Sequence, residues 1–233
     1  MQVALIGLVS VVGLMTLIWL SSIRMRDVSV VDVFWGLGFV LLAWQYWWLA
    51  GAAQTPRALL VPLLVTVWGG RLAAYIAWRS RGKGEDYRYA AMRQARGPRF
   101  VWISLFSVFW LQAVLLWIVA MPLLQVQRML EPRTLGLLDA VGLALFAVGL
   151  FFESVGDLQM ARFRSGPANR GRVMEQGLWR YTRHPNYFGD AMVWWGLSCL
   201  ALATPRSVWV LTGTALMTWL LMRVSGVTLL EQG

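Results

Sequence analysis

Long apolar runs separated by short polar segments dominate the pattern of the chain. Each run approaches the roughly 20 apolar residues that a helix needs to cross a bilayer. The seven runs cover residues 2–23, 30–51, 57–78, 100–127, 134–158, 188–203 and 206–227. No segment carries the signals of a β-strand. The pattern therefore predicts an all-α membrane protein, a seven-transmembrane-helix bundle that forms a single domain over residues 1–233.

Composition excludes several other classes of protein. Hydrophobic residues make up 58% of the 233 residues and charged residues 14%, whereas soluble domains have roughly 45–50% and about 25%. A disordered chain and an ordinary cytosolic enzyme are therefore excluded. Cys199 is the only cysteine, so we expect neither a disulfide scaffold nor a metal site. The first run lacks a basic segment before it and is expected to be a membrane span, not a cleaved signal peptide.

The basic residues predict the topology. The net charge is +10, and Lys83 is the only lysine among 21 basic residues. Fifteen of them fall in the first, third and fifth loops, and four in the other three loops. Because basic residues accumulate in cytoplasmic loops, we expect the N-terminus outside and the C-terminus in the cytoplasm. Confinement to loops argues against nucleic acid and favours anionic lipid headgroups, a phosphate-bearing ligand, or both.

Ionisable residues inside apolar runs are costly and usually face the interior of a bundle. Asp32 would share a helix face with Trp35 and Phe39, either as an interfacial carboxylate or as a functional group. Arg71 and Tyr75 lie four residues apart and would stack on one face. The arginine either snorkels to the membrane surface or reaches a bound anion.

A charged stripe follows the end of the fifth run. Glu153, Asp157 and Arg164 would fall within about 40° of one another on a helix. The stripe would continue past the membrane into the fifth loop. Its members either pair with one another or bind a ligand, and their alignment favours the ligand.

The densest group of polar and aromatic residues spans Glu175–Asp190. Pro185 disfavours helix at the residue before it and can open the next helix. Asn186 and Asp190 would then lie one turn apart on that helix. We expect four polar side chains to point into one cytoplasmic pocket, namely Arg180, Arg183, His184 and Asn186.

The segment Gly177–Gly189 resembles the signature of a bacterial membrane family related to steroid 5α-reductases. Asp157 with Arg164, the Arg71-x-x-x-Tyr75 pair and the sequence Val-Asp-Val-Phe-Trp-Gly around Asp32 are also similar to that family. The resemblance extends from about residue 28 to the end of the chain. The shorter core Arg-His-Pro-x-Tyr is also found in isoprenylcysteine carboxyl methyltransferases.

The chain departs from the family pattern at several positions. Asp190 stands where the family usually has glutamate, and Trp68 stands where it has a tyrosine that polarises the substrate. The glutamate partner of that tyrosine has no clear counterpart here, unless Asp32 or Gln45 replaces it. A basic C-terminal tail is also expected from the family, whereas this sequence ends at Gly233.

The resemblance implies a membrane enzyme that binds NADPH at the cytoplasmic half of its bundle. It would reduce a conjugated carbon–carbon double bond in a lipophilic steroid-like or isoprenoid 3-oxo-Δ4 substrate that enters from the bilayer. We expect a monomer in contact with membrane lipids in the bacterial inner membrane. The predicted cofactor-binding residues are Arg71, Asp157, Arg164, Arg172, Arg180, Arg183, His184, Asn186, Tyr187, Asp190 and Arg223.

The residues themselves also favour a dinucleotide. No glycine-rich turn follows a strand, so a Rossmann site is excluded and arginines would hold the phosphates. Reduction of an enone requires a donor that polarises the carbonyl, and Asp32, kept neutral by an apolar site, and Tyr75 are the predicted catalytic residues. The alternatives are a methyltransferase that uses S-adenosylmethionine and a non-enzymatic membrane scaffold. S-adenosylmethionine is cationic at sulfur and has no phosphates, so arginine-rich loops favour NADPH over it.

Overall fold

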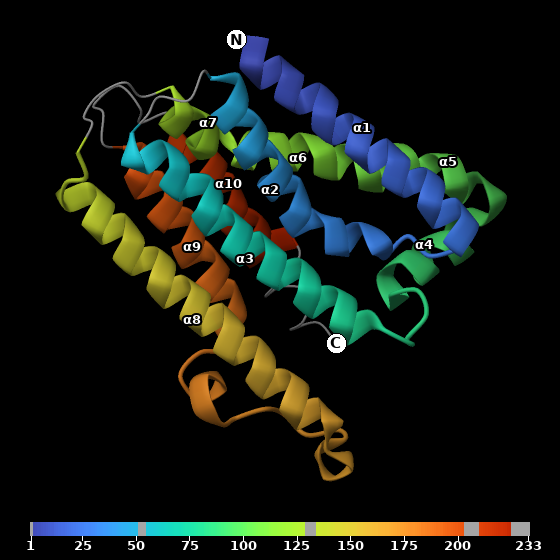
Figure 1. The fold of residues 1–233 in the computed structure, drawn as a ribbon. Coiled ribbons are helices and arrows are strands. Elements are labelled where there is room, and N and C mark those ends of the chain that lie inside the picture. Colours follow the sequence, from blue (N-terminus) through green and yellow to red (C-terminus); the bar gives the residue numbers. More distant parts are fainter. Residues whose placement is uncertain (1, 51–54, 129–133, 203–209, 225–233) are drawn as a thin grey trace. The chain divides into compact units, whose positions relative to one another are not determined.

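The computed structural model describes residues 2–50, 55–128, 134–202 and 210–224. Within these ranges the chain is helical and has no strand, which confirms the all-α prediction. Contacts between Cα atoms divide the chain into two units, Met1–Leu130 and Glu131–Gly233. Figure 1 colours the first unit from blue to green and the second from yellow to red. A single domain over residues 1–233 stays a prediction.

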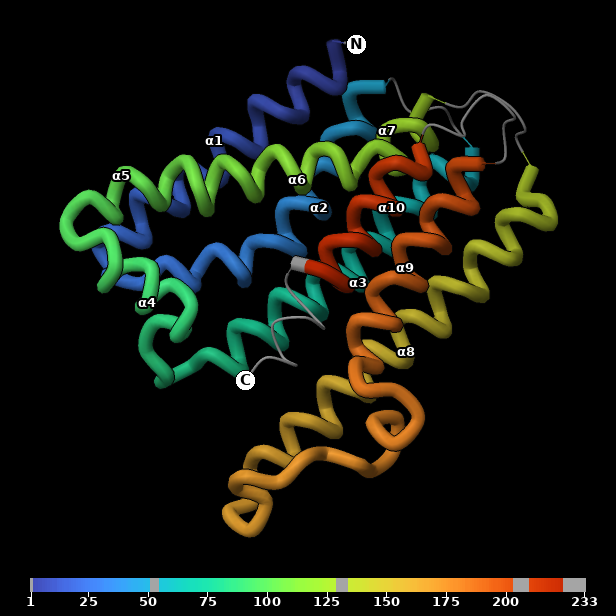
Figure 2. The backbone as a smooth tube through the Cα atoms, turned by 180° about the vertical axis from the view of Figure 1, so that it is seen from behind, coloured from blue at the N-terminus to red at the C-terminus, as the bar shows by residue number. Residues whose placement is uncertain are grey.

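The N-terminal unit is built from helices of very different lengths. Among its described residues these are α1 (Gln2–Met25), α2 (Val30–Leu49), α3 (Pro56–Ser80), α4 (Tyr87–Arg96), α5 (Phe100–Ser104), α6 (Leu111–Val119) and α7 (Met121–Gln127). A π-helical turn over Leu105–Trp110 joins α5 to α6. Figure 2 shows α5, this turn and α6 as one continuous rod. The helix α4 lies in the third loop, where the apolar pattern gave no sign of it.

The C-terminal unit is dominated by one long helix. Its described helices are α8 (Leu137–Ser165), α9 (Pro185–Ala201) and α10 (Leu211–Trp219), which a π-helical turn over Leu220–Val224 extends. Short 3₁₀ turns over Pro167–Asn169 and Gly177–Arg180 shape the loop between α8 and α9. As predicted, Pro185 opens α9, and α8 continues beyond the apolar run to include Arg164.

Five described segments are long and apolar enough to cross a membrane. They are Gln2–Met25, Val30–Leu49, Pro56–Ser80, Tyr87–Val119 and Leu137–Ser165. Seven spans are not confirmed, because α9 has 17 residues and α10 has nine, and parts of the last two predicted runs lie outside the described residues. The fourth predicted run is wrong at its end: α6 stops at Val119, and Pro122 lies in the first turn of α7.

The outer surfaces of the long helices are apolar. Val9 is 71% exposed and Leu137 is 82% exposed, and many other large hydrophobic side chains are also exposed. A helix that is apolar on its outer face as well as its inner face suits hydrocarbon better than water as its surroundings. Tryptophan indoles fasten the first helix: Trp19 Nε1 donates to the Val101 carbonyl at 2.9 Å, and Trp117 Nε1 donates to the Ala4 carbonyl at 2.7 Å.

Glycines set the closest helix crossings. In the N-terminal unit, a Cβ at Gly36 of α2 would lie 2.6 Å from the carbonyl oxygen of Gly69 in α3. In the C-terminal unit, a Cβ at Gly149 of α8 would lie 2.5 Å from the carbonyl oxygen of Gly189 in α9, and one at Gly142 would crowd α9 in the same way. Such small residues let helix backbones approach closely within membranes. The crossing of α8 and α9 therefore has no room for a side chain.

We expect Gly149→Ala to destabilise the protein, although alanine favours helix over glycine by about 1 kcal/mol. The added methyl meets backbone atoms of α9 below 3 Å, so the helices must separate, and overpacking of this kind costs about 1–3 kcal/mol. The measurement is the thermal unfolding midpoint in detergent. Gly13→Ala is the matched control, because nothing lies within 4 Å of its Cβ, and it should leave the midpoint unchanged or raise it. Equal midpoints for the two variants would contradict the close crossing.

Candidate functional site

A polar network surrounds Asp32 at one end of the N-terminal unit. Asp32, in the first turn of α2, accepts hydrogen bonds from Arg88 Nη2 at 2.9 Å and from the Tyr89 hydroxyl at 2.8 Å. Arg88 also donates through Nε to Asp86 at 2.8 Å. Both oxygens of Asp32 therefore serve as acceptors that hold α4 against α2. This arrangement differs from the neutral hydrogen-bond donor that sequence reasoning proposed for Asp32.

The same network joins two connecting segments. Glu85 accepts from the Val28 backbone at 2.8 Å, and the Asp86 backbone donates to Ser29 Oγ at 2.9 Å. Arg93 binds both oxygens of Glu85, through Nε at 2.8 Å and Nη2 at 2.7 Å. These hydrogen bonds from Arg93 lower the pKa of the Glu85 carboxyl below its ordinary value of 4.5, against the opposing effect of burial. The third loop is thus an ordered structure and not a free connection.

The predicted pair Arg71 and Tyr75 lies on α3, one turn apart as expected. Both side chains are half-buried. The guanidinium of Arg79 lies 5.6 Å from the centre of the Tyr75 ring, and the Trp78 ring lies 6.1 Å from it. The tyrosine is thus held between neighbours of its own helix, and its catalytic role stays a prediction.

Besides Asp139 in the first turn of α8, three carboxyl groups are buried in the described part of the C-terminal unit. Glu153 and Asp157 on α8 are 3% and 6% exposed, and Asp190 on α9 is 8% exposed. Asp157 Oδ1 accepts from Asn186 Nδ2 at 3.3 Å, so the two predicted residues meet where α8 and α9 cross. Arg164 ends the same stripe of α8 but is exposed. The stripe therefore passes from a buried carboxylate region to an exposed cation.

Asn186 carries the clearest sign of an absent partner. Its Oδ1 atom is buried, and the described residues offer it no hydrogen bond. Buried amide oxygens are nearly always bonded, so each exception needs a physical reason. Since Nδ2 already donates to Asp157, the remaining capacity of this side chain is that of an acceptor. A ligand with an N–H or O–H group would satisfy it.

The turn Gly177–Arg180 folds back onto α8. The Leu178 backbone donates to Gln159 Oε1 at 3.0 Å, and Trp179 Nε1 donates to the Gly156 carbonyl at 3.0 Å. Gly177 has φ of +60°, and a Cβ there would lie 2.4 Å from the Gln159 amide. Only glycine fits this position without strain. The sequence Gly-Leu-Trp is thus the segment that docks the fifth loop.

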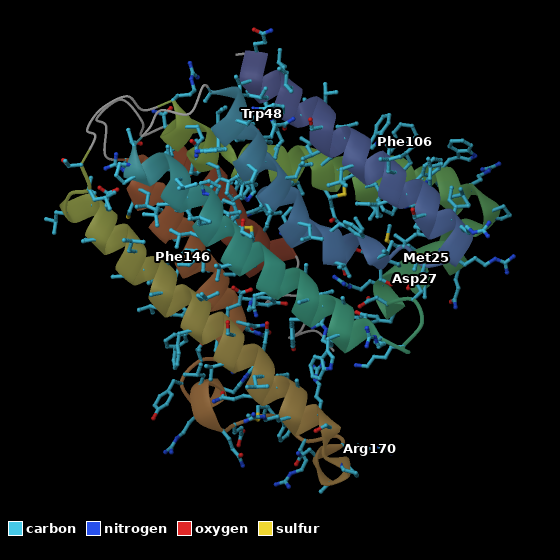
Figure 3. The ribbon with its side chains drawn as sticks, viewed as in Figure 1. Met25, Asp27, Trp48, Phe106, Phe146 and Arg170 are labelled. Atoms are coloured by element: carbon cyan, nitrogen blue, oxygen red, sulfur yellow. The ribbon has the colours of Figure 1, made fainter. Side chains whose placement is uncertain are left out.

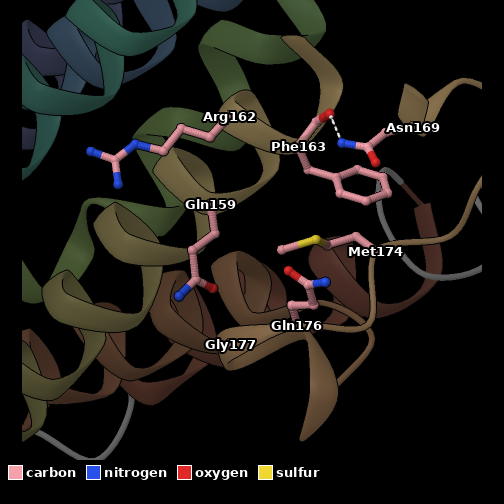
Figure 4. Close-up of a pocket in the computed structure, with 7 residues that line it drawn as sticks. All are labelled: Gln159, Arg162, Phe163, Asn169, Met174, Gln176 and Gly177. Carbon is pink, nitrogen blue, oxygen red and sulfur yellow. Dashed lines mark hydrogen bonds between the residues drawn. The ribbon is translucent and has the colours of Figure 1, made fainter. Parts of the chain in front are cut away.

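Two cavities lie along this docked loop. One, of about 390 Å³, is shown in Figure 4 and is lined by Gln159, Arg162, Phe163, Asn169, Met174, Gln176 and Gly177. The other, of about 880 Å³, is lined by Met160, Val173, Met174, Glu175, Trp179, Arg180, Arg183 and His184. Volumes of roughly 300–1,000 Å³ are typical of small-molecule sites. Three of the predicted pocket residues, Arg180, Arg183 and His184, share the larger cavity.

Of the other predicted residues, Tyr187 packs against a cavity residue, whereas Arg172 and Arg223 are exposed. His184 stacks on Tyr187 with ring centroids 5.5 Å apart, so these two lie together. Arg172 is exposed in the loop, and Arg223 is exposed in the π-helical turn after α10.

Sequence reasoning missed several residues of the cavities. Gln159, Asn169 and Gln176 are amides that either line a cavity or dock the loop. Asn169 also caps the end of α8 by donating to the Phe163 carbonyl at 2.8 Å, drawn as a dashed line in Figure 4. An amide side chain gives a weaker sequence signal than a charged one. The available signal for Gln159 was its position two residues beyond Asp157, on a segment predicted to be helical.

Comparisons with known proteins give a family and distant relatives. A family model described as "Protein of unknown function (DUF1295)" matches residues 18–233. An uncharacterized protein of Schizosaccharomyces pombe is 26% identical over 215 residues, which are 81% of this chain and 62% of that protein. The probable O-methyltransferase ustE of Ustilaginoidea virens is 35% identical over 80 residues, which are 34% of this chain and 27% of that protein. The chain therefore spans less than two thirds of either relative, and no solved structure matches it.

We expect Glu85→Gln to lower the unfolding midpoint at neutral pH and to have less effect in acid. The folded-state pKa of Glu85 is depressed, mainly by Arg93, so its contribution is complete above the unfolded pKa. That contribution is lost as the pH falls through the folded pKa. It should amount to roughly 1 kcal/mol, because Arg93 is partly exposed to water.

Thermal unfolding of the detergent-solubilised protein between pH 7 and about pH 3 measures this effect. Glu175→Gln, at an exposed glutamate of the fifth loop, is the control and should follow the wild type at every pH. A Glu85→Gln effect that is the same at both ends of the range would show that the ion pair is not its cause.

Proposed function

The chain belongs to the DUF1295 family, and we propose that it is a membrane-embedded reductase that uses NADPH. It reduces a conjugated carbon–carbon double bond in a lipophilic steroid-like or isoprenoid 3-oxo-Δ4 substrate. The observation that carries this proposal is Asn186 beside Asp157, whose amide oxygen is buried and has no hydrogen bond from the described residues, next to a loop whose cavities are lined with arginine. The enzyme would reside in the bacterial inner membrane as a monomer, with its N-terminus outside and its C-terminus in the cytoplasm.

The residues around Asn186 fit a nicotinamide nucleotide. A carboxamide presents N–H donors, which the acceptor Oδ1 of Asn186 requires. Asp190 lies one turn further along α9 and is buried, so it is suited to accept from ribose hydroxyls. Because a carboxylate is costly to bury, each hydroxyl of a ligand that donates to it stabilises the complex.

Arginines supply the charge that a dinucleotide needs. Arg162 lines the smaller cavity, and Arg180 and Arg183 line the larger one. Guanidinium groups bind phosphate oxygens bidentately, and they remain charged at any physiological pH. The exposed Arg164, Arg170 and Arg172 at the tip of this region are the candidates for the 2′-phosphate that distinguishes NADPH from NADH.

The residues of α3 are suited to the substrate side of the reaction. NADPH, when bound, supplies a hydride to the β-carbon of the conjugated double bond. The Tyr75 hydroxyl can donate to the substrate carbonyl and stabilise the negative charge that develops on its oxygen, with Arg71 one turn away. We assign this role to Tyr75 and not to Asp32, because Asp32 already accepts from Arg88 and Tyr89.

A methyltransferase that uses S-adenosylmethionine is the second candidate. The similarity to ustE favours it, as does the Arg-His-Pro-x-Tyr core at residues 183–187. Its cofactor carries a sulfonium cation, however, and the cavities hold Arg162, Arg180 and Arg183 with Glu175 as the single carboxylate of their linings. Repulsion between like charges therefore favours the anionic dinucleotide.

We expect NADPH to raise the unfolding midpoint of the wild-type protein, because a ligand that binds only the folded state stabilises it. NADH should bind about 10- to 150-fold more weakly, since a charge-assisted contact to the 2′-phosphate contributes about 1.5–3 kcal/mol. S-adenosylmethionine should produce no shift. Thermal unfolding in detergent with each compound in turn makes the measurement, and a shift with S-adenosylmethionine alone would replace the reductase by the methyltransferase.

We also expect Asn186→Ala and Asp190→Ala to abolish the shift caused by NADPH while leaving the bundle folded. Both changes remove a ligand contact in the C-terminal unit. Gln127→Ala is the matched control, because Gln127 Oε1 is likewise buried without a described hydrogen bond but lies at the end of α7. It should keep the full NADPH shift. If both site variants retained the shift, the site would be assigned to the wrong residues.

A further inference from the structure

Exposed cations gather at the end of the N-terminal unit that holds the Asp32 network. Two hydrogen bonds hold the turn after α1 against the segment before α4: the Val28 backbone N–H donates to Glu85 Oε1, and the Asp86 backbone N–H donates to Ser29 Oγ. Figure 3 labels Met25 and Asp27 at this end, beside α4. The seven exposed basic residues of these segments are Arg24, Arg26, Arg79, Arg81, Lys83, Arg96 and Arg99, which we term the cationic end.

The acidic residues of the same segments do not neutralise the cationic end. Asp27 accepts from the Ser29 backbone at 2.9 Å, and Asp32, Glu85 and Asp86 accept from Arg88, Arg93 or neighbouring groups. All four carboxylates are only partly exposed. The half-buried Arg88 and Arg93 pair with three of them, Asp32, Asp86 and Glu85, so two of the four negative charges remain against the seven exposed cations. The charged residues between positions 22 and 100 that are exposed are therefore all basic.

Exposed aromatic side chains lie beside these cations. Trp78, in the last turns of α3, is 59% exposed, Tyr87 at the start of α4 is 72% exposed, and Trp102 of α5 is 63% exposed. Trp78 lies near the end of the apolar segment Pro56–Ser80, and Tyr87 begins the segment Tyr87–Val119. Tryptophan and tyrosine at such positions mark the level of the lipid headgroups in membrane proteins. The cationic end therefore lies at the level where phosphate groups are concentrated.

We propose that the cationic end binds the headgroups of anionic phospholipids, with phosphatidylglycerol as the representative type. Planar guanidinium groups bind phosphate oxygens bidentately, and six of the seven cations are arginine. Each basic residue near an anionic membrane surface improves binding by about five-fold. This surface lies in the N-terminal unit and uses none of the residues assigned to NADPH, so either assignment can fail without the other.

The test uses the full chain in dodecyl maltoside, titrated with phosphatidylglycerol or with phosphatidylcholine of the same acyl chains. Phosphatidylglycerol should raise the unfolding midpoint, and phosphatidylcholine should not. Arg81→Gln/Lys83→Gln should raise the half-saturating concentration of phosphatidylglycerol about 30-fold, because two exposed cations are removed. Salt at 1 M, where the Debye length is about 3 Å, should abolish the difference between the two lipids. Native mass spectrometry should show fewer retained phosphatidylglycerol molecules for the variant.

Arg128→Gln is the control, since it removes an exposed arginine that lies outside the cationic end and outside the residues assigned to NADPH, and it should respond to phosphatidylglycerol as the wild type does. If Arg81→Gln/Lys83→Gln does not fold, Arg96→Gln/Arg99→Gln is used in the same comparison. Equal stabilisation by the two lipids would overturn the proposal. So would equal responses of the test and control variants, or an equal shift with inorganic phosphate alone, which would indicate an anion site without a lipid.

Discussion

The close approach of α8 and α9 is the constraint on which the C-terminal unit depends. Gly149 and Gly189 bring the two backbones together so tightly that neither helix can carry a side chain at the crossing. In the same crossing, Gly156 packs against Pro185 and leaves its carbonyl to accept the Trp179 indole. As a consequence Asp157 and Asn186 lie within hydrogen-bonding distance, and the loop between the helices returns to α8. Helix packing without side chains thus positions the polar groups of the candidate site.

In the N-terminal unit, side-chain hydrogen bonds order a long polar connection, the third loop. Two carboxylates of this unit each have a hydrogen-bond donor: Arg88 and Tyr89 donate to Asp32, and Arg93 donates to Glu85. Because one charge-assisted hydrogen bond is stronger than a neutral one, a few such contacts can hold α4 without a large apolar core beneath it. The aromatic ring of Phe100, 4.9 Å from the Arg93 guanidinium, adds an apolar contact to the same side chain. A connection rich in charge is therefore as well defined as the helices around it.

The sequence alone predicts the helices that lie in lipid, because an apolar run of about 20 residues matches the thickness of the hydrocarbon core and satisfies its backbone only as a helix. The start of α9 follows from Pro185, and the shared face of Asn186 and Asp190 follows from helix periodicity. The helix α4 could not be predicted in this way, since its stability comes from contacts with Asp32 and Glu85, which are distant in the chain. For the same reason the sequence does not predict that Asp32 acts as a hydrogen-bond acceptor, because its donors, Arg88 and Tyr89, lie 56 and 57 residues away. The seven-residue spacing of Gly142, Gly149 and Gly156 was visible in the sequence and would have indicated the α8 crossing.

The contacts of Arg88 and Arg93 require arginine and could not be made by lysine. Arg93 binds both oxygens of Glu85 with two nitrogens, and Arg88 joins Asp86 and Asp32 with Nε and Nη2 at the same time. An ammonium group has no planar fork and cannot hold two acceptors in fixed directions, so lysine would leave one of them without its donor. The same geometry that fixes carboxylates inside the protein suits phosphates at its cavities and at its membrane surface. Arginine therefore fixes the carboxylates of the N-terminal unit, and the same group would serve the proposed phosphate contacts at the cavities and at the cationic end.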